Sequence, residues 1–306
     1  HSGGIEELSI VVRFEGDTND FAWIIPAPSQ PSVDSISVEV FDELAYLSRP
    51  VYRDRGMGCG CWEDRGRPFG PGGYDGREGG NGALDDGVDI VGEGTVGLLD
   101  YLILHATNPV VLKDSLESWG YEYPDEAELL FRYYIEKEWE YFVAARVDTS
   151  EVGGSYGYYY GNIPVKLSFQ CAEPVYPMKI SSLSSEGTDL VLYVVADHRM
   201  TLDGATLKYS ERIDDEELDF IRENYPHLVG LFQGTRFVTK LERWFEEDEM
   251  EDIVLERAPD DQEYREMIFT GIPGDGLILA SLLCLITLWR IGRRRRVGGT
   301  SMSKAV

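Results

Sequence analysis

The C-terminal part of the chain places the strongest constraint on its architecture. Residues 277–289 form an apolar run, and five arginines follow between Arg290 and Arg296. Thirteen residues span roughly 20 Å as a helix, and the run comes closer to the ~30 Å hydrocarbon core if it extends to Ile291 with Arg290 snorkelling. A buried core helix is the alternative, but such a helix is seldom followed by so basic a cluster. We therefore predict a transmembrane helix at 277–291.

The flanking segments orient this helix. The positive-inside rule places the arginines and the basic tail, residues 292–306, in the cytoplasm. The segment GIPGDG at 271–276 is predicted to be a linker, because Gly and Pro interrupt regular structure. Residues 1–270 are therefore expected to form an extracytoplasmic domain at the cell membrane. This orientation needs a signal segment, which we expect to have been cleaved or to precede His1. The residues assigned to the anchor are Leu277, Trp289, Arg290, Arg293, Arg294, Arg295 and Arg296.

The charge of the chain is divided unevenly. Of its 28 Lys and Arg and 55 Asp and Glu, residues 277–306 contain six of the basic residues and none of the acids. Residues 1–276 therefore carry a net charge of −33. A domain with this much negative charge repels the phosphates of nucleic acids, which argues against nucleic-acid binding. A solvated surface, a salty or acidic habitat, cation binding and a basic partner stay open as reasons for the acidity.

The ectodomain mixes strand and helix patterns without a strict alternation, which predicts an α+β fold with a mixed or largely antiparallel sheet and flanking helices. FAWIIP at 21–26 is an almost wholly apolar strand that we expect to be buried, with Pro26, Pro28 and Pro31 ending it. Further strands are expected at 8–16, 88–107, 141–148, 163–170, 175–183, 188–200 and 253–255. Helices are expected from Ser37 as N-cap to Pro50, from Asn108 as N-cap to Gly120, and at 124–139, 215–223 and 239–245.

Two loops are candidates for contact with other proteins. Twelve of the 32 residues from Gly56 to Gly87 are glycine, which predicts a long exposed loop. Gly153–Asn162 carries four tyrosines in ten residues, and Tyr with Gly suits a contact loop, although the rings could instead cover the adjacent sheet. The contact candidates are Tyr156, Tyr158, Tyr159, Tyr160, Trp62 and Tyr74.

Three cysteines lie outside the predicted membrane helix, which itself contains Cys284. They are Cys59, Cys61 and Cys171. An odd number leaves one of them free, paired between chains, or paired with a residue that precedes this chain. We favour a disulfide from Cys171 to one member of the CGC pair, with a C-x-C metal half-site as the alternative.

Several stretches together resemble the Domain of Unknown Function 2330 family. They include FEGDTNDFAWIIPAPSQP, VFDELAYLSRP, VGLLDYLILHATNPVVLKDSLESWGY, IPVKLSFQCAEPVYPMKISSL and RFVTKLERWFEEDEMEDIVLERAP, and the likeness covers most of residues 8–258. The resemblance implies a secreted or membrane-anchored prokaryotic protein. Members often begin with a cysteine-containing segment, which would account for the odd cysteine. The resemblance to this family implies no activity and no catalytic residues for this chain.

Catalytic and metal motifs are weak. His105 and His198 each follow an apolar strand, and with Asp197 they could serve an extracytoplasmic hydrolase, but no nucleophile turn accompanies them. The acids of Glu246–Asp252 could hold Ca²⁺, although they lack the spacing of a calcium loop and a solvated helix end is the simpler interpretation. We predict no cofactor and no resident metal.

The sequence thus favours a non-catalytic role. We expect a structural, accessory or interaction subunit of a membrane complex, with the lipid bilayer and other proteins as partners. The alternatives are the His/Asp hydrolase and a Ca²⁺- or metal-responsive adhesion module.

Overall fold

The computed structural model describes residues 4–17, 22–54, 87–97, 99–121, 123–147, 158–183, 187–232 and 236–270. These residues belong to two compact units. The larger contains the described residues up to Arg49 and from Gly87 to Arg265, and the smaller contains those at 50–54 and 266–270. Mostly antiparallel sheets with few helices confirm the predicted α+β class.

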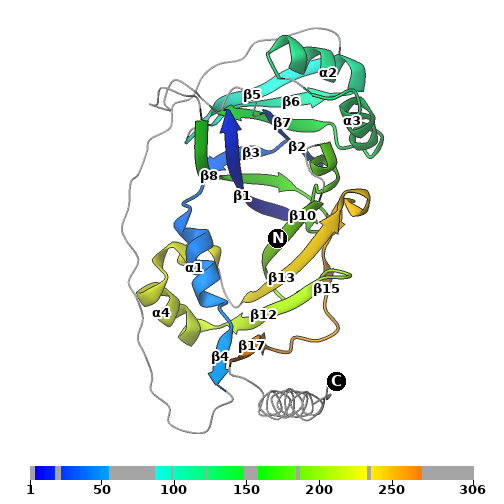
Figure 1. Ribbon diagram of the computed structural model, residues 1–306. Coiled ribbons are helices and arrows are strands. Elements are labelled where there is room, and N and C mark those ends of the chain that lie inside the picture. The colour runs from blue at the N-terminus through cyan, green and yellow to red at the C-terminus, as the bar shows by residue number, and fades with distance from the viewer. Residues whose placement is uncertain are drawn as a thin grey trace, which may run out of the picture. The chain divides into compact units, whose positions relative to one another are not determined.

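Two antiparallel sheets build one part of the larger unit (Figure 1). The first has the order β1-β8-β3, formed by Ile5–Asp17, Tyr158–Gln170 and Ser32–Ser35. β1 and β8 pair along their whole length, from Ile5 opposite Gln170 to Asp17 opposite Tyr158. The second sheet has the order β2-β7-β6-β5, formed by Ala22–Ala27, Tyr141–Val147, Leu99–Ala106 and Val88–Val96.

Strand β2 accommodates the proline-rich segment at a sheet edge. Ile24, Ile25 and Ala27 are buried, as predicted for this apolar strand. Pro26 lies within β2, opposite Phe142, and the strand ends at Ala27, one residue after the predicted end and directly before Pro28. The edge position explains the difference, because a residue without an N–H is tolerated where no neighbouring strand needs a donor.

Helices α2 (Pro109–Ser118) and α3 (Ala127–Glu136) pack with these sheets in one apolar core. The predicted start of α2 is confirmed, because Asn108 Oδ1 accepts hydrogen bonds from the N–H groups of Val110 and Val111 at 3.0 and 3.3 Å. Pro109 occupies the first turn, where its missing N–H has no partner to lose. Local capping chemistry therefore sets where this helix begins.

A four-stranded antiparallel sheet organises the rest of the larger unit. Its order is β10-β13-β12-β16, formed by Gly187–Ala196, Arg236–Glu246, Thr206–Ile213 and Tyr264–Arg265. One face packs on α1 (Glu39–Leu47), α4 (Asp215–Asn224) and the 3₁₀ helix η3 (Pro226–Leu231). The other face packs on Met178, Met200, Met250, Ile253 and Leu255. Both faces of the sheet therefore carry an apolar core.

Short elements complete this unit. Two-stranded pairs join β9 (Val175–Tyr176) to β14 (Ile253–Val254) and β11 (Met200–Thr201) to β15 (Glu256–Arg257). The 3₁₀ helices η2 and η4 cover Lys179–Leu183 and Glu247–Glu249. The strand expected at 175–183 is thus wrong beyond Tyr176, and the one expected near 253–255 is confirmed as β14.

The segment at 239–245 is a strand and not the predicted helix. It forms the centre of β13, which pairs with β10 on one side and β12 on the other. Its side chains alternate between the two cores, with Val238 in one and Leu241 and Phe245 in the other. This period of two is the strand signal that the helical interpretation overlooked.

Two other predictions need correction. Helix α1 has Val38 at its N-cap, while the Ser37 hydroxyl bonds the Glu39 carboxylate instead of a backbone N–H. The predicted tyrosine-rich loop at 153–162 is shortened, because strand β8 begins at Tyr158. The helices expected at 124–139 and 215–223 are confirmed as α3 and α4.

The smaller unit contains β4 (Val51–Asp54) and β17 (Met267–Thr270), which pair in parallel with Met267 opposite Val51. Within the described segments, no helix has the length and apolar character needed to cross a membrane. The predicted transmembrane helix and basic tail, at 277–291 and 292–306, lie outside those segments.

Candidate recognition site on the β10-β13-β12 sheet

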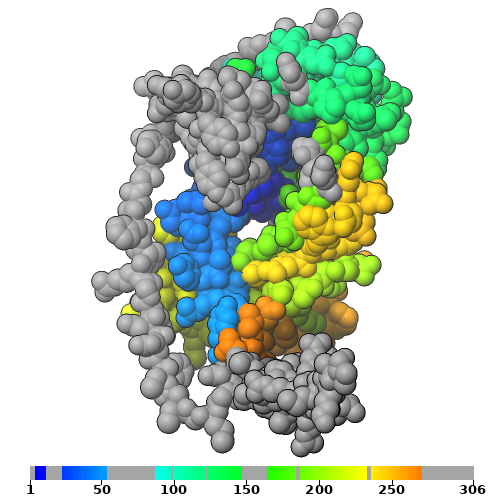
Figure 2. Space-filling view, viewed as in Figure 1, coloured from blue at the N-terminus to red at the C-terminus, as the bar shows by residue number. Residues whose placement is uncertain are grey.

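One face of the β10-β13-β12 sheet is covered at one end and open at the other. At the covered end, Val238 and its cross-strand neighbour Val195 lie in the core beneath α1 and α4. Further along the same face lie the cross-strand pairs Tyr193–Lys240, Val191–Glu242 and Asp189–Trp244. Val191 and Trp244 are about half exposed, at 48% and 51%. In Figure 2, the atoms of β13 appear in gold on the near face of the larger unit.

The open end of this face borders a shallow hollow of about 450 Å³. We call it the Trp244 hollow, and it is lined by Asp189, Gly204, Thr206, Lys208, Glu242, Arg243, Trp244 and Glu249. Polar and charged side chains make up most of this lining, with one large aromatic ring. A ring that combines apolar area with a polar N–H, set among polar groups that fix orientation, is a common recognition arrangement.

The indole of Trp244 is held in place on two sides. Its Nε1–H donates a hydrogen bond of 3.0 Å to Oε1 of Glu246. Its six-membered ring lies against Gly187, where a Cβ atom would approach Cζ2 to 2.5 Å. Only a glycine leaves room for the ring in this orientation. The ring is therefore positioned before any partner arrives.

The guanidinium of Arg243 is fixed in a similar way. Nη1 donates a hydrogen bond of 2.8 Å to the carbonyl of Asp203, and Nη2 lies 3.7 Å from the carboxylate of Glu249. A Cβ atom at Gly204, which has a φ of +71°, would lie 3.1 Å from Cζ of the guanidinium. The group also lies over the ring of Phe245, 4.3 Å from its centroid. Arg243 borders the hollow, but it is held on the side of β13 that carries Phe245, opposite the side that carries Trp244.

Charges of both signs meet at Glu242. Lys240 Nζ lies 2.9 Å from one carboxylate oxygen and Lys208 Nζ lies 3.6 Å from the other. Asp189 and Glu249 add two further carboxylates to the lining. The hollow holds three acids and two bases among its lining side chains, in keeping with the acidic character of residues 1–276.

The histidines proposed for catalysis lie apart and have different partners. His105 Nε2 lies 3.1 Å from Glu140 Oε2, at the end of β6. His198 Nδ1 lies 2.9 Å from Asp261 Oδ2, after β10. Asp197 forms an ion pair with Arg236. The structure therefore does not bring His105, His198 and Asp197 together as one site.

The third described histidine also bonds a carboxylate. His227 Nδ1 lies 2.7 Å from Glu43 Oε1, and the His227 backbone N–H donates to Glu43 Oε2 at 3.0 Å. Glu43 is buried on α1, so this pair links α1 to η3.

Asp252 is the centre of a polar cluster that the sequence analysis did not find. Its carboxylate accepts hydrogen bonds from the hydroxyls of Tyr133 and Tyr134 at 3.2 and 2.7 Å, and Lys137 Nζ lies 2.7 Å away. The Lys179 N–H donates to it as well, at 3.3 Å. The Asp252 side chain is only 3% exposed. The prediction that the acidic run at 246–252 is a solvated helix end was wrong for this residue.

A second buried carboxyl, Glu6, lies on β1. It accepts a hydrogen bond of 2.8 Å from the N–H of Val175. Burial raises the pKa of Glu6 to about 7, against the smaller lowering effect of that hydrogen bond. Alternation alone could have indicated its inward direction, because Leu8 and Ile10 on the same face of β1 are also buried.

Several predicted site residues lie outside the described segments. They are Tyr156, Trp62, Tyr74, Cys59, Cys61 and all the anchor residues from Leu277 onwards. Tyr158, Tyr159 and Tyr160 are described only as backbone in β8. Cys171 Sγ donates to the carbonyl of Glu173, and burial raises the pKa of this thiol. In the described part of the chain, no group of three or more His, Cys, Asp or Glu side chains is placed to hold a metal ion.

These features define a mixed α+β protein, built mostly on antiparallel sheets, with a shallow hollow beside the β10-β13-β12 sheet. The chain belongs to the DUF2330 family, described as an uncharacterized protein conserved in bacteria, whose model matches residues 1–255. The resemblance seen in the sequence is thereby confirmed. Comparison with curated proteins and with solved structures gave no match.

Proposed function

We propose that this protein is a single-pass, membrane-anchored cell-envelope protein whose extracytoplasmic α+β domain binds another protein as an accessory or structural subunit. The observation that carries the binding role is the positioned, half-exposed indole of Trp244 on the open sheet face. The apolar run at 277–289 and the arginines after it support the anchor.

The energetics of recognition favour the Trp244 hollow as the contact site. Trp and Arg are among the residue types most often found as binding hot spots. Trp244 lies on this sheet face and Arg243 borders the hollow from the opposite side of β13, and each is held by a hydrogen bond. Because the side chains are already ordered, a partner does not have to bear the cost of immobilising them. Exposed Val191 beside the hollow adds apolar area that a partner can cover.

The charge of the domain points to a partner with a basic surface. Residues 1–276 carry a net charge of −33, and three carboxylates line the hollow. A Lys or Arg side chain could lie over the indole of Trp244 while it faces Asp189 or Glu242. Association of this kind is steered by charge, so we expect it to weaken as the ionic strength rises.

The alternative of a His/Asp hydrolase receives less support. In the described residues, His105 and His198 have separate carboxylate partners, and Asp197 is held by Arg236. A hydrolytic centre would need these groups to leave their partners and converge. The binding role requires no such rearrangement.

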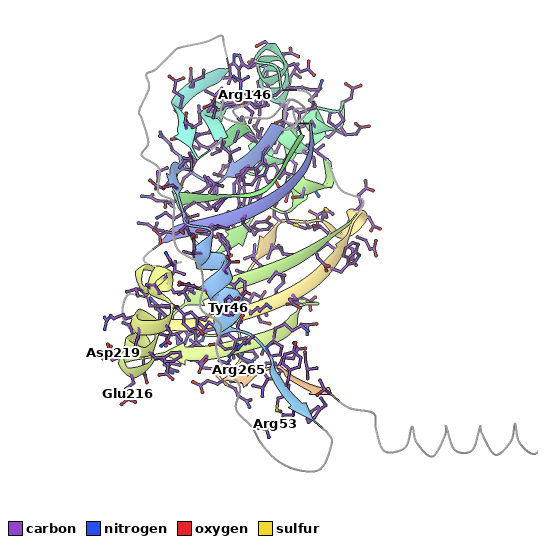
Figure 3. The ribbon with its side chains drawn as sticks, turned by 60° about the vertical axis from the view of Figure 1, so that its left-hand side comes forward. Tyr46, Arg53, Arg146, Glu216, Asp219 and Arg265 are labelled. Atoms are coloured by element: carbon purple, nitrogen blue, oxygen red, sulfur yellow. The ribbon has the colours of Figure 1, made fainter. Side chains whose placement is uncertain are left out.

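The test is to isolate the protein with its partners. The full chain is solubilised from native membranes in a mild detergent, and the mass and subunit composition of the complex are measured. We expect a partner at a fixed ratio, lost in Trp244→Ala and retained in Tyr46→Ala. Tyr46, labelled on α1 in Figure 3, is a matched control because it is 53% exposed and aromatic. A solitary monomer, or equal loss in both variants, would contradict the proposal.

A further inference from the structure

The Asp252 carboxylate lies among donors that come from two other segments of the larger unit. Oδ1 accepts hydrogen bonds from the Tyr134 hydroxyl at 2.7 Å and from the Lys179 N–H at 3.3 Å. Oδ2 accepts them from the Tyr133 hydroxyl at 3.2 Å and from Lys137 Nζ at 2.7 Å. Each oxygen thus receives two donors, which matches the capacity of an ionised carboxylate. We call these four donors the carboxylate cradle.

Contacts that do not involve Asp252 hold the two tyrosines of the cradle. The Tyr134 hydroxyl accepts a hydrogen bond of 3.1 Å from the N–H of Ile180. The Tyr134 ring stacks on the ring of Trp139, with 5.7 Å between the centroids, and meets the Tyr133 ring edge-on at 5.1 Å. Because these contacts belong to the surrounding structure, both hydroxyls keep their positions when the Asp252 carboxylate is removed.

The two lysines of the cradle are held by aromatic rings as well. Lys137 Nζ lies 4.1 Å from the centroid of the Trp139 ring, and Lys179 Nζ lies 4.8 Å from the centroid of the Tyr133 ring. Lys179 also forms an ion pair with Glu251. Loss of the Asp252 carboxylate would leave two lysines and one acid in this cluster. The emptied cradle would therefore carry an excess of positive charge that favours an anion.

The cradle offers protonated donors, and one of its members reaches solvent. Burial, together with the Asp252 charge, raises the pKa of Tyr133 to about 12, so this hydroxyl keeps its proton at neutral pH. The Asp252 side chain is 3% exposed, whereas the Lys137 side chain is 34% exposed. A small anion could therefore approach the buried donors along Lys137.

We propose that the cradle is a preformed binding site for a carboxylate group, and that the chain's own Asp252 is the ligand that occupies it. Two donors on each of two oxygens select a planar carboxylate over a spherical ion such as chloride. Recognition of this one group ties the connection that follows β13 to α3 (Figure 1). Residues 1–276 carry a net charge of −33 and repel anions in general, so an anion bound here would be bound by these donors.

The test empties the cradle and offers it a free carboxylate. Asp252→Ala removes one carboxylate and leaves a gap of the size of formate. The thermal unfolding midpoint of the full chain in detergent is measured in sodium formate, and in sodium chloride at the same ionic strength. Wild type and Asp248→Ala are the controls, because both keep Asp252 in the cradle and Asp248 is an exposed acid of the same run. Benzoate, which is too large for the gap, controls for size.

We expect formate to raise the midpoint of Asp252→Ala by several degrees over chloride, with saturation, as a ligand of the folded state does. Formate should leave wild type and Asp248→Ala at their chloride values, and benzoate should have no such effect on Asp252→Ala. Adding Lys137→Met removes one charged donor and keeps an apolar stem, so the formate concentration needed should rise by about tenfold or more.

Two results would overturn the inference. One is an equal midpoint of Asp252→Ala in formate and chloride, and the other is an equal effect of formate on Asp248→Ala. If Asp252→Ala does not fold in chloride, the yield of folded chain after refolding replaces the midpoint. Recovery in formate and not in chloride would then support the cradle, and failure in both salts would overturn it.

Discussion

The hydroxyl of Tyr134 donates a hydrogen bond of 2.7 Å to Oδ1 of Asp252, a residue 118 positions later in the chain. Tyr134 lies on α3 in an apolar core that includes residues of β7, and Asp252 precedes β14. The same hydroxyl accepts a hydrogen bond from the N–H of Ile180. One buried contact thus joins three distant segments, and burial with the nearby Asp252 charge raises the pKa of Tyr134.

Replacing Asp252 should destabilise the larger unit. Asp252→Ala leaves two tyrosine hydroxyls and the Lys179 N–H without their acceptor, and we expect a loss of roughly 3 kcal/mol in the free energy of unfolding. Urea denaturation of the full chain in detergent measures it. Asp248→Ala, in the same acidic run but exposed, is the control, with an expected change within about 0.5 kcal/mol. Equal losses of unfolding free energy in the two variants would contradict a stabilising role for the hydrogen bonds of Asp252.

A methyl group at Gly187 should displace the Trp244 indole. In Gly187→Ala the new Cβ would lie 2.5 Å from a ring carbon, so the ring must move from its position over the hollow. We expect partner recovery to fall as in Trp244→Ala, with a thermal unfolding midpoint that still reports a folded protein. Gly230→Ala, with open space around its Cβ, should bind like the wild type. If Gly187→Ala recovers as much partner as the wild type, a fixed Trp244 indole is not the contact with the partner.

Glu6 should make stability depend on pH. Its folded pKa of about 7 exceeds the ordinary value of 4.5, so the folded state holds a proton that the unfolded state releases. The free energy of unfolding should therefore fall as pH rises from about 4.5 to about 7, by up to about 3 kcal/mol. Glu6→Gln should abolish this slope, and Glu7→Gln, an exposed neighbour, should not. The comparison is made by urea denaturation of the three proteins at several pH values.

The Glu43–His227 contact should hold η3 against α1. Glu43→Ala removes the acceptor of both the His227 ring and its backbone N–H, and a loss of about 2 kcal/mol in the free energy of unfolding is expected. The adjacent Asp42 is exposed, so Asp42→Ala serves as a matched control. In Glu43→Ala, backbone amide hydrogen exchange should also become faster in η3. Unchanged exchange in η3 would contradict the prediction that the Glu43–His227 contact links η3 to α1.

Features that depend on residues close together in the chain were predictable from the sequence. The Asn108 cap with Pro109 in the first turn, the buried strand at Ile24–Ile25 and the helix α4 follow from capping chemistry and apolar pattern. The period of two along β13 was also present in the sequence, and attention to it would have placed Trp244 on a sheet face. Its exposure could not be predicted, because exposure depends on where α1 and α4 stop covering the sheet.

The sequence alone determined the α+β class, most helices and strands, the asymmetry of charge and the family resemblance. Only the tertiary structure decided which carboxylate each histidine meets, that Asp252 is buried within an acidic run, and that Gly187 makes room for Trp244. The physical reason is the range of the forces involved. Capping and periodicity act between residues a few positions apart, whereas burial and pairing of polar groups depend on segments that only the folded chain brings together.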